Sequence, residues 1–136
     1  MIKTIIPKLI GGIINFIGIF NSAYASNLAL KLFSKPRAGQ LTSYANSFLE
    51  TATTKTTLHY NSLPIQTYHW KGIKKTVLLA HGWESNSGRW RHKIQKLQKE
   101  GYNVIALDGP AHGGSGSDTF NAILYSEFIN VVSEEF

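Results

Sequence analysis

The chain has 136 residues, of which 43% are hydrophobic and 12% aromatic, and this length and composition are typical of one globular domain rather than of a disordered polymer. It contains no cysteine, which excludes disulfides, thiolate metal sites and a cysteine nucleophile. The net charge of +6 is unevenly distributed along the chain, because residues 1–75 contain nine lysines and arginines and a single acidic residue, Glu50. These basic residues are scattered and accompany no nucleic-acid-binding motif. We therefore expect no nucleic-acid partner.

The first predicted element is an amphipathic helix over residues 2–20. Apolar side chains recur there at the spacing of one helix face, at Ile2, Ile5, Ile6, Leu9, Ile10, Ile13, Ile14, Ile17 and Phe20. The other face holds Lys3, Lys8, Gly11, Gly12, Asn15 and Gly18. Because Lys8 and Asn15 interrupt any long apolar run, the pattern favours a helix that lies on a protein or membrane surface over a helix that spans a membrane.

The helical pattern resumes at Leu28, Leu32 and Phe33 and stops before Pro36. We therefore expect residues 1–36 to form a helical segment of a cytoplasmic protein, with membrane-surface contact through residues 2–33 as one expectation. A secretory signal is the competing interpretation, since a basic start, an apolar stretch and Ala23-Tyr24-Ala25 resemble the three parts of a signal peptide. The protein would then be exported.

Residues 37–55 are rich in threonine and serine and are interpreted as a connection. Two runs of β-branched and aromatic residues follow, at residues 56–60 and 65–70, and residues 61–64 between them have the composition of a turn. These runs predict a β-hairpin.

A strand, a helix and a second strand are predicted next. Residues 76–80 and 103–107 are short apolar strands, and a helix over residues 88–100 lies between them, with Ser87 as its N-cap. This order predicts a parallel, right-handed βαβ unit. A last helix, from about residue 120, is expected to present Leu124, Phe128, Val131 and Val132 toward the sheet.

His81, Gly82 and Trp83 are candidate site residues because they directly follow the predicted strand at residues 76–80. Open parallel α/β sheets bind their ligands at the carboxyl ends of strands. Gly82 permits a tight bend, and the backbone N–H of Trp83, unpaired where the strand ends, is placed to face a developing negative charge. A simple turn is the alternative interpretation of these residues.

A second loop, residues 108–117, also follows a strand and precedes a helix. Ser115 stands where a phosphate-binding loop has its lysine, and the loop lacks the last glycine of a Gly-x-Ser-x-Gly elbow, so we expect neither a phosphate site nor a serine nucleophile here. Asp108 is expected to hold the loop through backbone N–H groups rather than to act as a catalytic carboxylate. The five histidines show no ligand pair at helical spacing, so we expect no metal and no cofactor.

The strand with His81-Gly82-Trp83 and the loop Asp108-Gly109-Pro110-Ala111-His112-Gly113-Gly114-Ser115 together resemble the α/β-hydrolase family, over about residues 56–136. Members commonly have a strand ending in His-Gly-x, a helix, a second strand and then Asp-x-Pro-Gly-x-Gly-x-Ser. The chain departs from this pattern at Ala111, where glycine is usual. The resemblance implies an α/β fold class: the amino-terminal part of an α/β-hydrolase sheet, made of a β-hairpin and a parallel βαβ unit after a helical segment.

The resemblance also implies a role for each candidate residue. Trp83 would donate its backbone N–H to an oxyanion hole while His81 and Gly82 shape the loop, and the nucleophile, acid and catalytic histidine would lie beyond Phe136. Glu84 replaces a proline that is common in the epoxide hydrolases and haloalkane dehalogenases of the family, which favours serine-dependent acyl transfer on a small-molecule substrate.

We therefore expect the amino-terminal part of an esterase-like serine hydrolase that acts on carboxylic esters or related acyl compounds. The chain ends before the nucleophile elbow, so it is expected to be inactive alone. The alternative is a noncatalytic membrane-surface or interaction protein on a truncated hydrolase scaffold, with residues 2–33 as its anchor.

Overall fold

A computed structural model describes the backbone of residues 2–136 and the side chains from Ile5 onward. The chain divides into two units, the first extending to Lys35 and the second running from Pro36 to Phe136. Each unit has its own internal packing.

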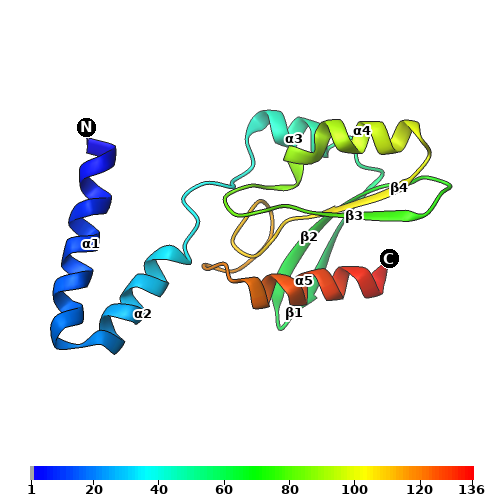
Figure 1. Cartoon of the computed structure of the whole chain (residues 1–136). Helices are drawn as coiled ribbons and strands as arrows, with labels where there is room; N and C mark the ends of the chain where they lie inside the picture. Colours follow the sequence, from blue (N-terminus) through cyan, green and yellow to red (C-terminus); the bar gives the residue numbers. More distant parts are fainter. Residues whose placement is uncertain (1) are drawn as a thin grey trace. The chain divides into compact units, whose positions relative to one another are not determined.

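The first unit is a pair of helices, α1 (Ile2–Phe20) and α2 (Ser22–Phe33), as the sequence predicted (Figure 1). Asn21 separates the helices and caps α2, because its side-chain oxygen accepts a hydrogen bond of 2.9 Å from the N–H of Tyr24. Within residues 2–136 no helix is both long enough and apolar enough to cross a membrane.

The face of α1 that packs on α2 coincides only in part with the predicted apolar face. Its half-buried residues are Ile10, Gly11, Ile14, Ile17 and Gly18, which recur at helical spacing and include two of the glycines. A Cβ atom at Gly18 would lie 3.6 Å from the Cβ of Ala25, the buried residue of α2. The small residue at position 18 lets the two helix axes approach there, whereas a Cβ atom at Gly11 would meet nothing within 4 Å.

The second unit is built on a four-stranded sheet with strand order β1-β2-β4-β3. Strands β1 (Thr54–Tyr60) and β2 (Leu63–Trp70) form the predicted hairpin, and β2 also pairs antiparallel with β4 (Asn103–Leu107). Strand β3 (Thr76–Ala80) pairs parallel with β4, as predicted. The bounds of β3 and β4 are those that the sequence predicted.

The hairpin turn is shorter than the four residues expected. Tyr60 pairs with Leu63, so the turn consists of Asn61 and Ser62, which have φ angles of 45° and 67°. Two successive residues with positive φ match the right-handed twist of the flanking strands. Leu63 and Pro64 therefore belong to β2, and proline is tolerated there because β2 begins to pair with β4 only farther along.

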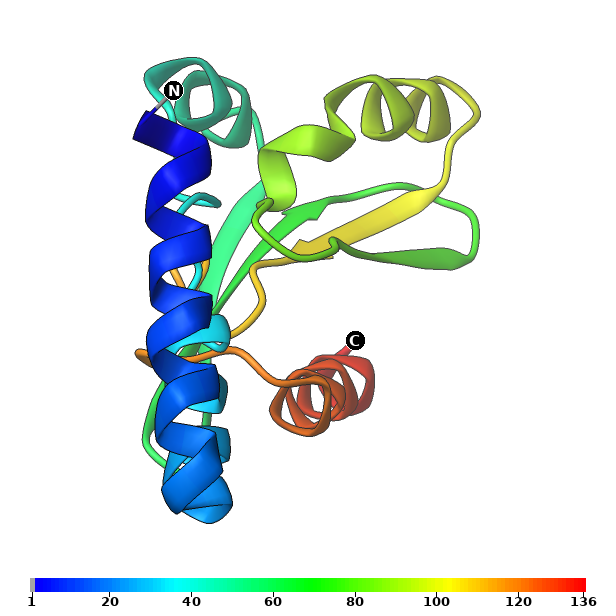
Figure 2. The same cartoon turned by 60° about the vertical axis from the view of Figure 1, so that its left-hand side comes forward.

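Helices cover both faces of the sheet: α3 (Ser43–Leu49) and α4 (Arg91–Lys99) lie on one face and α5 (Ala122–Glu135) on the other (Figures 1 and 2). Side chains that alternate along β4 contribute to both cores, because Val104 and Ala106 pack on the α3–α4 side and Ile105 and Leu107 on the α5 side. The first core also contains Phe48, Leu49, Tyr68, Trp70 and Ile94, and the second contains Ile65, Tyr125, Phe128 and Val132.

Two segments of this unit differ from the sequence interpretation. Residues 37–55, interpreted as a connection, contain α3, and its Phe48 and Leu49 are buried in the first core. A helix of seven residues is too short to show a clear apolar period, which is why the pattern did not reveal it. The residues directly before α4 form a 3-10 helix, η1 (Ser87–Trp90). Its N-cap is Asn86 rather than the predicted Ser87, because the Asn86 side-chain oxygen accepts a 3.0 Å hydrogen bond from the N–H of Gly88.

Candidate functional site

The loops that follow β3 and β4 leave the sheet at the same end, because the two strands are parallel and Ala80 lies opposite Leu107. The first loop begins with His81, Gly82 and Trp83, and the second begins with Asp108. The structure therefore brings both predicted site segments together at the carboxyl ends of two neighbouring parallel strands, where α/β proteins bind ligands.

Two buried histidines connect these loops, and we call their paired contacts the histidine clasp. Nε2 of His81, in the first loop, accepts a hydrogen bond of 2.8 Å from the N–H of Gly109 in the second. Nε2 of His112, in the second loop, accepts one of 3.0 Å from the N–H of Glu84 in the first. The two imidazole rings meet edge to face with their centroids 5.2 Å apart. Each loop thus supplies an imidazole that satisfies a backbone N–H of the other.

Both imidazoles of the histidine clasp are held as neutral tautomers with the proton on Nδ1. Nδ1 of His81 lies 2.8 Å from the carbonyl oxygen of Gly82, and Nδ1 of His112 lies 2.7 Å from that of Pro110. A carbonyl oxygen can only accept, so each Nδ1 carries a hydrogen and each Nε2 is free to accept. Burial lowers the pKa of His81 from its usual 6.5, an effect that the Gly82 carbonyl and the Asp108 carboxylate partly oppose.

The hydrogen bond from His81 to Gly82 also sets the direction of the Trp83 N–H. The Gly82 carbonyl and the Trp83 N–H belong to one peptide unit, which is trans, and these two groups point in opposite directions in a trans peptide. Because His81 holds the carbonyl oxygen, the Trp83 N–H points away from the His81 ring. This N–H donates no hydrogen bond within residues 2–136.

Aromatic side chains pack together beside the loop that carries this peptide unit, although Gly82 and Trp83 are themselves exposed. The Trp83 indole is 43% exposed, and its ring centroid lies 5.6 Å from that of His112 and 5.3 Å from that of Phe120. Tyr125, from α5, packs on both Phe120 and His81, with centroid distances of 5.5 and 5.7 Å. These contacts hold the Trp83 side chain, while the backbone beside it at Gly82 is open, since a Cβ atom there would meet no heavy atom within 4 Å.

Asp108 holds the second loop through backbone N–H groups, as predicted. Its carboxylate is fully buried and accepts hydrogen bonds from the N–H of Ser87 at 2.8 Å and the N–H of Gly114 at 2.9 Å. The Tyr68 hydroxyl donates a third, at 3.2 Å, and burial together with the Asp108 charge raises the pKa of Tyr68. Donors from β2, η1 and the second loop thus converge on one carboxylate, which makes it a structural group.

The position of the Asp108 carboxylate also explains why residue 113 of the same loop is glycine. Gly113 has a φ of 51°, and a Cβ atom there would overlap the Asp108 carboxylate. Ala111 adopts a left-handed φ of 61°, a conformation that favours glycine, which is the usual residue here in the α/β-hydrolase motif that this loop resembles. Ser115 is not free to attack a substrate, because its hydroxyl donates to the Asp108 carbonyl at 2.6 Å and accepts from the Gln66 N–H at 2.9 Å.

The observed backbone conformation at Glu84 is incompatible with proline, the residue common at the corresponding position in some of the hydrolases that this loop resembles. The φ of Glu84 is 51°, whereas proline is restricted to about −65°, and its N–H is the group that His112 accepts. The observed conformation of the first loop therefore requires a residue other than proline at position 84.

Two contributions to the site were not predicted from the sequence. One is the acceptor role of His112, for which the only signal was its place in the loop motif that resembles the α/β-hydrolase family. The other is Gly39, whose carbonyl accepts the N–H of Gly113 at 3.0 Å and whose φ of 95° lets the backbone approach the His112 ring, where a Cβ atom would overlap. Nothing in the composition of residues 37–55 indicated that they contact the site.

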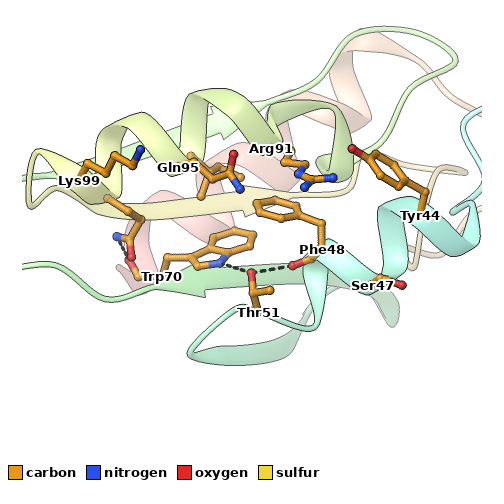
Figure 3. A pocket seen from close by; sticks show the side chains of 10 residues that line it. Tyr44, Ser47, Phe48, Thr51, Trp70, Arg91, Gln95 and Lys99 are labelled. Atoms are coloured by element: carbon orange, nitrogen blue, oxygen red, sulfur yellow. Dashed lines mark hydrogen bonds between the residues drawn. The ribbon is translucent and has the colours of Figure 1, made fainter.

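A pocket of about 650 Å³ lies elsewhere, between α3 and α4 (Figure 3). The stacked rings of Phe48 and Trp70 line it, with the Arg91 guanidinium over the Tyr44 ring at 4.8 Å. No residue of the two loops at the strand ends lines this pocket. Among the side chains from Ile5 onward, no three histidine, aspartate or glutamate residues gather as metal ligands would.

No protein-family model matches the chain. Over 53 residues it is 40% identical to the monoacylglycerol lipase of Mycolicibacterium smegmatis, and over 39 residues it is 46% identical to epoxide hydrolase A of Mycobacterium tuberculosis. These segments make up 39% and 29% of this chain but only 19% and 12% of the two relatives. The chain therefore matches a small part of the length of each curated relative.

Solved structures share the fold of most of this chain. An esterase of Pyrococcus furiosus superposes on 75% of this chain with a TM-score of 0.59 and 23% identity, and the match covers 40% of the esterase. An α/β-hydrolase of Vibrio vulnificus superposes on 70% of this chain with a TM-score of 0.58 and 19% identity, covering 35% of that chain. At such identities the likeness defines the fold.

Proposed function

We propose, on the premise that this chain has the fold of the amino-terminal part of an α/β-hydrolase, that it forms one half of the active site of a serine-type hydrolase acting on carboxylic esters or related acyl compounds. The observation that carries the proposal is the peptide unit between Gly82 and Trp83. Its N–H lies at the carboxyl end of β3, is oriented by His81 and has no acceptor within residues 2–136. Such a group is suited to bind an anionic oxygen.

In this proposal the Trp83 N–H is one donor of an oxyanion hole. Attack of a serine on an acyl carbonyl places negative charge on the carbonyl oxygen, and a donor fixed in advance stabilises that charge without having to reorganise. His81 and Gly82 are positioning residues, because they set the direction of the peptide unit. His81 is not the catalytic base, since its Nε2 already accepts the Gly109 N–H. The nucleophile, base and acid would come from chain that follows Phe136.

Two residue types are candidates for the nucleophile of the whole enzyme, serine and aspartate. The sequence match to a monoacylglycerol lipase and the requirement for a residue other than proline at position 84 both support serine-dependent acyl transfer. The match to epoxide hydrolase A supports a second candidate, in which an aspartate nucleophile opens an epoxide. The residue at the nucleophile elbow distinguishes the two.

The first experiment reads the coding sequence downstream of Phe136 and expresses the whole encoded chain. We expect a Gly-x-Ser-x-Gly elbow, hydrolysis of p-nitrophenyl esters and labelling of that serine by a fluorophosphonate. The 136-residue chain assayed alone should show no hydrolysis. An aspartate at the elbow would contradict acyl transfer in favour of epoxide opening, and a stop codon after Phe136 would favour the noncatalytic, membrane-surface alternative.

The second experiment removes the proposed donor from that whole chain. Trp83→Pro eliminates the backbone N–H, and we expect it to lower kcat by about 100- to 1000-fold while KM changes little. Trp83→Phe is the matched control, because it alters the exposed indole and keeps the N–H. If the two variants lose activity equally, the Trp83 amide is not an oxyanion donor.

A further inference from the structure

Helix α1 exposes an apolar stripe that its packing on α2 does not use. Ile5, Ile6, Leu9, Ile13, Phe16 and Phe20 are between 51% and 77% exposed and recur at the spacing of one helix face. The half-buried residues of α1, from Ile10 to Gly18, lie on a different face. We call the six exposed residues the α1 stripe. Exposed apolar patches of this kind mark contacts with proteins or membranes rather than with water.

Helix α2 adds exposed apolar side chains to this unit. Tyr24 is 59% exposed, Leu30 65% and Phe33 71%. On α1, Phe16 and Phe20 lie edge to face with their centroids 5.4 Å apart. Phenylalanine and leucine side chains are typical of the apolar face of helices that lie at the boundary between lipid headgroups and acyl chains, and the Tyr24 hydroxyl is suited to the headgroup side of that boundary.

The charge of the same unit has a single sign. Residues 1–49 contain no aspartate or glutamate, and lysines stand at positions 3, 8, 31 and 35 of the two-helix unit. Lys8, Lys31 and Lys35 are exposed. A surface that combines an apolar stripe with lysines and no acid is complementary to a bilayer containing anionic lipid, while a second copy of the unit would bring like charges together.

We propose that α1 and α2 bind the surface of a bilayer containing anionic lipid, with the α1 stripe inserted among the headgroups and α1 lying parallel to the membrane plane. Neither helix is long and apolar enough to cross the bilayer, so the interaction is peripheral. The lysines attract the anionic headgroups electrostatically, and salt weakens this attraction. Burial of the α1 stripe in the bilayer is a hydrophobic contribution that does not require low salt.

Vesicle flotation of the 136-residue chain tests this proposal. We expect the protein to float with vesicles of phosphatidylcholine containing about one third phosphatidylglycerol, and to bind pure phosphatidylcholine at least about tenfold more weakly. Raising the salt concentration should weaken binding to the anionic vesicles. The double substitution Leu9→Ser and Phe16→Ser, at two exposed positions, should lower the partition coefficient by at least about tenfold.

The matched control is the double substitution Ile73→Ser and Ile123→Ser, which removes apolar side chains that are 96% and 77% exposed in the second unit. It should bind vesicles as the unsubstituted chain does, and far-ultraviolet circular dichroism should show that both doubly substituted chains keep their helix content. Protein that stays soluble with anionic vesicles, or equal losses in the two double variants, would overturn the proposal. A concentration-dependent dimer without vesicle binding would assign the stripe to a second copy instead.

Discussion

The histidine clasp requires two imidazoles that are unprotonated at Nε2, since each accepts a backbone N–H there. The charged or titratable groups around His81 are Asp108, His112 and Arg89, and Tyr125 packs on its ring. Because burial lowers the pKa of His81, the folded protein binds this proton less tightly than the unfolded chain does. The stability that neutral His81 contributes is therefore complete above about pH 6.5 and is lost as the pH falls through the folded-state pKa.

Urea unfolding at several pH values measures this effect. We predict that the free energy of unfolding of the unsubstituted chain decreases as the pH is lowered from about 7 to about 5, and that His81→Gln has a smaller pH slope, on top of a general loss of stability. His59→Gln is the control, because His59 is exposed on β1 and should keep the full slope. Equal slopes in the unsubstituted chain and in His81→Gln would show that His81 does not titrate between the two states.

Among the elements, α3 contributes two buried side chains, Phe48 and Leu49, to the first core. It lies within a segment whose composition resembles a connection, yet Phe48 is only 7% exposed and stacks on Trp70 with ring centroids 5.5 Å apart. Thr42 caps the helix through a 3.1 Å hydrogen bond from the Ala45 N–H. A short helix has little stability of its own, so tertiary packing rather than propensity accounts for its presence.

Substitutions in α3 test whether this segment is a helix of the core or a connection on the surface. Phe48→Ala should lower the free energy of unfolding by about 3 kcal/mol or more, since it removes a buried aromatic ring and leaves a cavity. Tyr44→Ala, on the same helix, should cost less than about 1 kcal/mol, because Tyr44 is 67% exposed and its contact with Arg91 is a surface cation–π pair. Similar effects of the two substitutions in urea unfolding would argue against a core role for α3.

At the scale of the whole molecule, the two units differ in how much they bury. The second unit has two cores around β4, and Val104, Ala106 and Leu107 are fully buried there. In the first unit Ala25 is the one buried residue among the side chains described from Ile5 onward. Local opening costs little where few apolar side chains are buried.

Hydrogen exchange measured by mass spectrometry should therefore divide the chain at residue 35. Without lipid, we expect peptides from α1 and α2 to exchange at least about tenfold faster than peptides that contain β4 or the middle of α5. Peptides from the hairpin turn at Asn61 serve as the reference for fast exchange within the second unit. Protection of residues 5–33 equal to that of residues 103–107 would show that the first unit is stabilised by packing that these contacts do not account for.

The amino-acid sequence by itself was enough to predict the two helices of the first unit, the hairpin, the bounds of β3 and β4 and the place of His81, Gly82 and Trp83 at a strand end. Each of these depends on apolar period, turn composition or caps, and so on residues close together in the chain. Only the tertiary structure showed the face on which α1 packs, the burial of α3 and the histidine clasp, whose bonds join residues 28 positions apart. Such contacts depend on which strands become neighbours in the sheet, and the local sequence pattern contains no information on that pairing.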